Sequence, residues 1–288
     1  MTTTVLVDGL RFGESPRWHD GRLWFSDLFD GAVHAVDLEG NVERIVDVPG
    51  QPGGIGWLPD GRLLVVSMVE RRLMRLDAGG LAVHAELAPL ATFHANDMVV
   101  DGEGRAYVGN FGFDLDDAVA TRGAAAFTDH DLAVLVRVDP DGSTHAAADG
   151  LDFPNGSVIT ADGRTFIVAE TFAARLTAFD IEGDGSLTNR RVWADLGEAM
   201  PDGICLDADG NIWFASPVES ACVRVAPGGE VLDRIITEQP CLACMLGGDD
   251  GRTLFLVTCS TYVASATAAS RTGRIETVRV VSPGAGLP

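Results

Sequence analysis

The sequence predicts an all-β protein, a six-bladed β-propeller, from three features. The 34 glycines and 13 prolines of the 288 residues are spread along the chain, as expected for many short strands separated by turns. Apolar residues alternate with a period of two rather than 3.6, which excludes a stack of helical pairs. A turn motif recurs six times, which indicates a repeat protein.

Each repeat contains an Asp-Gly or Gly turn, then a polar residue and an apolar run. The turn glycines are Gly21, Gly61, Gly104, Gly163, Gly210 and Gly251. Successive intervals are 40, 43, 59, 47 and 41 residues, a period typical of propellers and solenoids. The longest interval therefore indicates an insertion.

Four strands are expected in most repeats. Apolar runs before and after the turn, such as residues 55–58 and 63–66, are typical of a β-hairpin. A third run ending in Asp follows, as in residues 35–37, and then a fourth, as in residues 42–46. Four strands in each of six repeats describe a propeller, whose small sheets surround a central channel.

The two ends of the chain are expected to share the last blade, because an open ring would expose sheet edges. Residues 4–7 would add the outer strand to a blade that contains residues 253–257 and 275–278. Residues 1–288 would then form a single propeller domain.

The insertion lies between Gly112 and Asp131 and is rich in Asp and Ala. It is expected to leave the blade as a loop or a short helix. Long loops are more often functional than short ones, so it either lies over a channel mouth or is a surface excursion without a role.

The charge and the cysteines limit the possible partners and the location. A formal net charge of −21 would repel the phosphates of nucleic acid. The N-terminus lacks a signal sequence, and no apolar stretch approaches the ~20 residues that span a bilayer. Five cysteines, an odd number, indicate reduced thiols, and the pair Cys241 and Cys244 is expected to pack in the last blade rather than to act in redox chemistry. We expect a cytoplasmic protein that binds a small-molecule substrate and neither nucleic acid nor membranes; the sequence predicts no oligomeric state.

Polar side chains recur at one position, where the innermost strand of each repeat begins. Eight residues before the turn glycine lie Gly53, Asn96, Asn155, Asp202 and Ala243, and seven residues before the first turn glycine lies Glu14. The starts of the innermost strands crowd around the axis of a propeller, so Glu14, Asn96, Asn155 and Asp202 are expected to converge. The alternative is that they are turn residues, since Asn-Gly and Asp-Gly are common turn dipeptides.

Converging carboxylates and carboxamides predict a site for one divalent metal ion. A hard cation offsets the repulsion between Glu14 and Asp202, and the carbonyl oxygens of Asn96 and Asn155 complete an oxygen shell. Such a set suits Ca²⁺, Mg²⁺ or Mn²⁺, and Zn²⁺ also binds carboxylates.

At these positions the sequence resembles the gluconolactonase, regucalcin and luciferin-regenerating enzyme family. The matching segments are residues 13–18, 96–97, 153–156, 201–204, 247–248 and 253–255. The resemblance runs nearly end to end and implies a six-bladed fold. It also implies that Glu14, Asn155 and Asp202 are metal ligands, that Asn96 contacts the substrate or adds a ligand, and that Asp202 is the general base.

The resemblance implies a metal-dependent hydrolase that opens a small lactone. The metal would polarise the carbonyl while Asp202 activates a water molecule. His94 stands where sugar-lactone members typically carry Arg, so the expected substrate is either a sugar lactone or a more apolar lactone. His94 itself would be a catalytic acid or base, or a substrate-contacting wall of the pocket.

Aromatic residues are expected around the channel. They are Trp18, Trp57, Phe111, Phe113 and Phe172, of which Trp18 and Phe111 would contact the substrate. The alternative is that these rings pack between blades.

Other functions stay open. The same pocket could hydrolyse a phosphotriester, or act as an enolate-type lyase or aldolase. A non-catalytic propeller that calcium stabilises for binding a partner is the alternative from another class.

Overall fold

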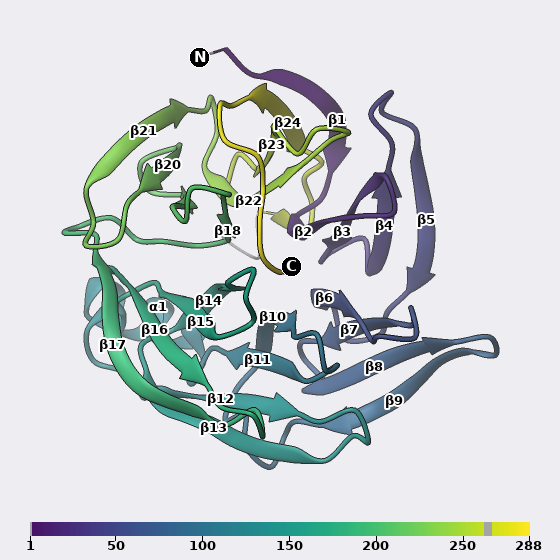
Figure 1. The fold of residues 1–288 in the computed structure, drawn as a ribbon, viewed down its shortest axis with the longest axis vertical. Coiled ribbons are helices and arrows are strands. Elements are labelled where there is room, and N and C mark those ends of the chain that lie inside the picture. The colour runs from purple at the N-terminus through teal and green to yellow at the C-terminus, as the bar shows by residue number, and fades with distance from the viewer. Residues whose placement is uncertain (1, 262–266) are drawn as a thin grey trace.

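The computed structural model describes residues 2–261 and 267–288 and contains six four-stranded antiparallel sheets arranged as a ring (Figure 1). The all-β six-bladed propeller predicted from the repeat is thus confirmed. Each sheet is a blade, and we number the blades 1 to 6 from the N-terminus. No helix in the described part of the chain has the length and apolarity needed to cross a bilayer.

The first five blades are each built from four consecutive strands. Blade 1 contains β2 (Gly13–His19), β3 (Arg22–Asp27), β4 (Ala32–Val36) and β5 (Val42–Asp47). Blade 2 contains β6 (Pro52–Trp57), β7 (Leu63–Ser67), β8 (Arg72–Asp77) and β9 (Gly80–Glu86). Blade 3 contains β10 (Ala95–Val100), β11 (Ala106–Asn110), β12 (Ala133–Val138) and β13 (Thr144–Leu151). Blades 4 and 5 contain β14 (Pro154–Ile159), β15 (Thr165–Glu170), β16 (Arg175–Ile181) and β17 (Leu187–Asp195); and β18 (Ile204–Leu206), β19 (Ile212–Ser216), β20 (Ala221–Val225) and β21 (Val231–Ile236).

Blade 6 joins the two ends of the chain. It contains β22 (Cys241–Gly247), β23 (Thr253–Thr258) and β24 (Gly273–Arg279), and β1 (Thr4–Leu10) is its outermost strand. β1 runs antiparallel to β24, with Thr4 opposite Thr277. The predicted closure by the N-terminal strand is therefore present, and it covers the edge of β24.

The core lies within and between the blades. Many strands nearest the axis or second from it are buried along most of their length, whereas the outermost strands alternate or are exposed. All five cysteines are free and buried, and Cys241 and Cys244 belong to an apolar core cluster with Cys205 and Cys222. The expectation that they pack rather than react agrees with this burial.

The C-terminal segment runs from blade 6 to the centre of the ring (Figure 1). Leu287 exchanges backbone hydrogen bonds of 2.8 and 2.9 Å with Ile159, at the end of β14. The N–H of Ala285 donates to the carbonyl oxygen of Leu206, at the end of β18. The segment thus ties blade 6 to blades 5 and 4, at the end of the ring where the innermost strands finish.

The insertion contains two short helices between β11 and β12. They are α1 (Leu115–Arg122) and the 3-10 helix η1 (Gly123–Phe127). Asp114 caps α1 by accepting a hydrogen bond from the N–H of Asp117. A short helix was one of the two forms expected for this insertion.

Candidate active site

Four innermost strands bring oxygen-bearing side chains into one pocket. The pocket has a volume of about 310 Å³ and is lined by Glu14 of β2, Asn96 of β10, Asn155 of β14 and Asp202, two residues before β18. We call these four side chains the oxygen cluster. Gly53 of β6 also lines the pocket, on the side where the repeat has no polar side chain.

Irregular pairing of the innermost strands accompanies the cluster. The register with the second strand shifts between Glu14 and Arg17 in β2, and the same happens at the start of β6, β10 and β14. A bulge re-aims a side chain and interrupts the ladder. Asn96 and Asn155 therefore stand within such an interruption, and Glu14, which pairs with Ser26, stands at the edge of one.

The glycines that follow cluster residues are required for close packing and do not form turns. Asn155 and Gly156 lie inside β14, which excludes the turn interpretation for this pair. A Cβ on Gly156 would lie 2.5 Å from the nitrogen of Ile204, and one on Gly203 would lie 2.6 Å from the Cβ of Ala243. Glycine thus lets neighbouring innermost strands approach closely enough for the cluster to form.

The two carboxyl groups of the cluster belong to half-buried residues that line the pocket. Burial raises the pKa of Glu14 to about 8, and the charge of Asp97 adds to the rise. Burial, followed by the charge of Glu14, raises the pKa of Asp202 well above its usual range. Among the described residues, no arginine lies within ion-pair distance of either carboxylate.

The arginine whose charge acts on Glu14 is already paired. Arg17 is buried and its Nη2 donates to Asp97 Oδ1 at 2.6 Å and to the carbonyl oxygen of Met98 at 2.7 Å. If Glu14, Asp97 and Asp202 are all ionised, the single positive charge of Arg17 leaves two negative charges unbalanced. A divalent cation matches this deficit.

The donor chemistry of the cluster also fits a hard cation. Asn96 Nδ2 donates to Asn155 Oδ1 at 3.3 Å, and Asn155 Nδ2 donates to Thr171 Oγ1 at 3.4 Å. In the described residues, no three or more His, Cys, Asp and Glu side chains form a group that could hold a metal. An ion in this pocket would thus depend on carboxamide and water oxygens as well as on two carboxylates.

Apolar side chains form most of the remaining lining. Phe111 and Phe172, two of the predicted aromatic residues, line the pocket. Phe113 lies behind them, with its ring stacked on His130 at a centroid distance of 4.4 Å. Sequence reasoning missed several apolar lining residues, namely Phe12, Leu28, Met68, Leu115, Phe127, Phe153 and Met200.

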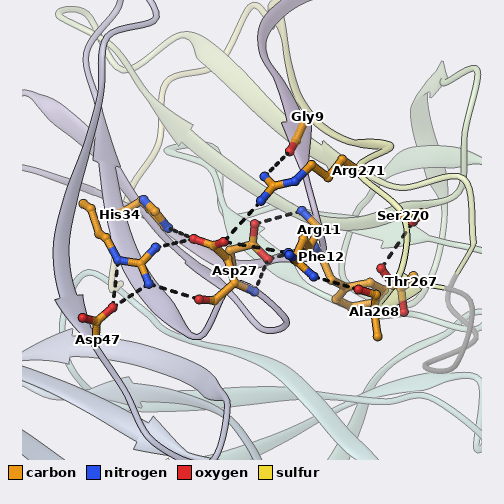
Figure 2. Close-up of polar contacts among 12 residues, drawn as sticks. Gly9, Arg11, Phe12, Asp27, His34, Asp47, Thr267, Ala268, Ser270 and Arg271 are labelled. Carbon is orange, nitrogen blue, oxygen red and sulfur yellow. Dashed lines mark hydrogen bonds and ion pairs between the residues drawn. The ribbon is translucent and has the colours of Figure 1, made fainter.

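A second register in the repeat identifies three of the missed residues. Phe12, Phe153 and Met200 each stand two residues before a member of the oxygen cluster, and all three line the pocket. The loop before β2 is fixed by Asp27, whose carboxylate accepts hydrogen bonds of 2.9 Å from the backbone N–H groups of Arg11 and Phe12 (Figure 2). This pair of bonds holds Phe12 at the pocket.

His94 lies beside this pocket and does not line it. It lines a neighbouring pocket of about 650 Å³ together with Asp114, Asp116 and Asp117. The two pockets share Phe111 and other apolar residues. Burial lowers the pKa of His94, which favours the neutral ring. The structure therefore does not bring His94 together with Glu14 and Asp202.

Trp18 and Trp57 lie at the other end of the innermost strands. Trp18 is four residues beyond Glu14 in β2, which corresponds to about 13 Å of extended chain, and it lines pockets formed with the C-terminal segment. Its ring stacks on Phe255 at 5.4 Å, and Trp57 stacks on His19 at 3.8 Å. This corrects the expected place of Trp18 among the substrate-contacting residues and favours inter-blade packing for Trp57.

Comparisons with known proteins identify relatives of this chain. Residues 12–260 match the family model described as SMP-30/Gluconolactonase/LRE-like region. A pentonolactonase of Haloferax volcanii is 29% identical over 266 residues, which cover 90% of this chain and 85% of that protein.

Two solved structures share the fold. A gluconolactonase of Xanthomonas campestris superposes with a TM-score of 0.72 at 25% identity, covering 99% of this chain and 89% of that one. A structure described as the calcium-binding protein regucalcin of Agrobacterium tumefaciens superposes with a TM-score of 0.80 at 21% identity, covering 100% of this chain and 96% of that one.

Proposed function

The chain belongs to the SMP-30/gluconolactonase/LRE-like family, and from this membership we propose that it is a metal-dependent hydrolase that opens the ring of a small lactone. The observation that carries the proposal is the meeting of half-buried Glu14 and Asp202 in one pocket, with no arginine within ion-pair distance of either among the described residues. The pocket volume of about 310 Å³ suits a small molecule. The names of the pentonolactonase and gluconolactonase relatives support a lactone as the substrate.

Glu14, Asn155 and Asp202 are the proposed ligands of one divalent ion. Asn96 adds a ligand or contacts the substrate. The oxygen donors suit Ca²⁺, Mg²⁺ or Mn²⁺ and also admit Zn²⁺. We favour calcium, because one similar structure is described as a calcium-binding protein.

Asp202 is the proposed general base. A bound divalent ion would supply Lewis-acid polarisation of the lactone carbonyl. The Asp202 carboxylate takes a proton from a water molecule as the water oxygen bonds to the carbonyl carbon. The ring C–O bond then breaks, and the departing oxygen receives the proton from Asp202, which yields the hydroxy acid. Burial raises the pKa of Asp202 in the protein without a metal, and a bound divalent ion would favour the ionised form that acts as the base.

Two broader features belong to the same proposal. We propose that residues 1–288 act as one domain, because β1 and β24 of the two chain ends pair in one blade. The five free, buried cysteines support a reducing, cytoplasmic location.

Acid release from a panel of lactones tests the proposal. Turnover is expected for at least one lactone in calcium and is expected to fall at least 100-fold with chelator. Asp202→Asn and Glu14→Gln are expected to lose turnover to a similar extent, whereas the matched controls Asp20→Asn and Glu238→Gln, whose side chains are both 84% exposed, keep it. Lactone turnover that neither the chelator nor Asp202→Asn reduces would contradict the proposal.

The other reactions have weaker support. Phosphotriester hydrolysis and enolate chemistry would draw on His94 as an additional acid or base, and this residue lines the neighbouring pocket. A calcium-stabilised binding module remains the alternative if calcium raises the melting temperature while no lactone is opened.

A further inference from the structure

The polar atoms of the site pocket gather in one place. Twelve of its eighteen lining residues are apolar or glycine, so the polar side chains are confined to the oxygen cluster, Ser15 and Thr171. The hydroxyl of Thr171 donates to the carbonyl oxygen of Pro201 at 2.8 Å and accepts a bond from Asn155. A substrate therefore finds almost all its hydrogen-bond partners at the position where the reacting ring would bind.

In five of the six blades, the residue that follows the second strand lines the pocket. In blades 1, 2, 3 and 5 this residue is apolar: Leu28, Met68, Phe111 and Pro217. Only blade 4 supplies a hydroxyl here, that of Thr171, which already forms hydrogen bonds with Pro201 and Asn155. The wall thus offers no free donor or acceptor along most of its circumference.

Aromatic rings continue this apolar wall away from the oxygen cluster. Phe111 and Phe153 have centroids 4.7 Å apart, and Phe153 and Phe172 have centroids 4.6 Å apart. Phe127 of η1 contacts Phe172 at 5.2 Å. The rings therefore form one continuous surface that extends from blade 3 to the insertion.

The insertion closes the apolar side of the pocket. Leu115 of α1 and Phe127 of η1 are both lining residues. The insertion is held down by Ala118 and Ala126, which are buried in a cluster with Phe113 and Phe153. His130, just after η1, lies with its Nε2 2.8 Å from Asp152 Oδ1. These contacts give the two helices a fixed place over the pocket.

From this arrangement we propose that the pocket selects lactones that carry an aryl or alkyl substituent over polyhydroxylated lactones of the same ring size. The inference rests on the proposed lactone hydrolysis and names its substrate class. The ring carbonyl meets the oxygen cluster, while the substituent lies against Phe111, Phe153 and Phe172, beneath the insertion. Hydroxyl groups at the same place would lose water without gaining a partner.

A series of five-membered lactones tests the selection. It contains γ-butyrolactone, γ-nonalactone, γ-phenyl-γ-butyrolactone and a pentono-γ-lactone, all assayed in calcium. We expect kcat/KM for the phenyl and alkyl compounds to exceed that for γ-butyrolactone at least tenfold. We expect the pentonolactone to fall about 100-fold or more below the phenyl compound, which is the discrimination typical of one added hydroxyl in an apolar pocket.

Variants of the insertion test the origin of the selectivity. Phe127→Ser and Leu115→Asn are expected to lower the ratio of kcat/KM for the phenyl compound to that for γ-butyrolactone about tenfold. The matched control is Val119→Ser, because Val119 lies on α1 like Leu115, is 40% exposed and does not line the pocket. Its ratio should stay unchanged, and a ratio is insensitive to any loss of folded protein.

The outcomes separate this inference from the proposed function. Preference for the pentonolactone, or a ratio that Phe127→Ser and Leu115→Asn leave unchanged, overturns the inference and leaves lactone hydrolysis intact. If no lactone in the series is opened, the proposed function fails. Binding affinities measured by calorimetry then test whether the pocket prefers an apolar ligand. Tighter binding of the phenyl compound than of the pentonolactone would still support an apolar ligand, and equal or reversed affinities would overturn it.

Discussion

Arg17 and Asp97 form a buried ion pair next to the oxygen cluster. Asp97 follows Asn96 in β10, and Arg17 lies three residues after Glu14 in β2. The pair therefore joins the innermost strands of blades 1 and 3. Its positive charge is held where two further carboxylates face the pocket, so we expect it to stabilise both the ring and the site.

Removing Arg17 should cost far more stability than removing an exposed arginine. Arg17→Met leaves the Asp97 carboxylate buried and unpaired, which typically costs about 3–5 kcal/mol. Arg22→Met is the control, because Arg22 pairs with Glu43 near the surface, where the two side chains are 34% and 64% exposed, so its loss should be below ~1 kcal/mol. Urea unfolding gives both free energies, and equal losses would contradict the role assigned to Arg17.

His34 should make stability depend on pH. Burial lowers the pKa of His34 and outweighs the attraction of Asp30 and Asp27, while Arg44 lowers it further. The unfolded chain therefore binds the proton more tightly than the folded protein, so stability is lost as the pH falls below about 6.5. His34→Gln should reduce the fall in melting temperature between pH 7.5 and pH 5.5. Identical pH profiles for the variant and the unchanged protein would contradict this assignment.

At the scale of the element, close contact between innermost strands decides which residues reach the pocket. Gly156→Ala should destabilise the protein by about 3 kcal/mol, because its Cβ would meet backbone atoms of Ile204 and Gly203. Gly79→Ala is the control, since a Cβ there meets nothing within 4 Å. Thermal unfolding measures both, and a Gly156→Ala protein as stable as Gly79→Ala would contradict the packing argument.

Sequence reasoning predicted the positions of the strands well but not their local geometry. The alternation of apolar residues and the turn glycines mark each hairpin, so the repeat and the register of Glu14, Asn155 and Asp202 are visible in the sequence. The shifts of register in β2, β6, β10 and β14 have no local signature, because a bulge depends on the partner strand. Trp18 was misplaced because the sequence does not show at which end of the ring a side chain lies.

At the scale of the whole molecule, the two chain ends close the ring in different ways. β1 completes the last sheet, which the exposed edge of an open ring made predictable. The C-terminal segment after β24 crosses to Leu206 and Ile159, and sequence reasoning did not foresee this crossing. A segment rich in Gly and Pro that forms isolated backbone bonds leaves no periodic pattern.

Removing residues 283–288 should lower stability while sparing the site. The segment forms backbone hydrogen bonds with Ala208, Leu206 and Ile159. We expect a loss of about 2 kcal/mol, equivalent to about 3 °C in Tm for a chain of this size. Lactone turnover should persist at 25 °C, because the pocket lies at the opposite ends of the innermost strands. An unchanged Tm, or a folded truncated protein without turnover, would contradict this division.

The central claim is that Glu14, Asn155 and Asp202 hold one divalent ion, and anomalous scattering from crystals soaked in Mn²⁺ tests it most directly. The account predicts a single strong anomalous peak in the site pocket, with oxygen atoms of these three side chains within about 2.0–2.6 Å. Crystals that show no peak there, or whose only peaks lie on the outer strands, would contradict it.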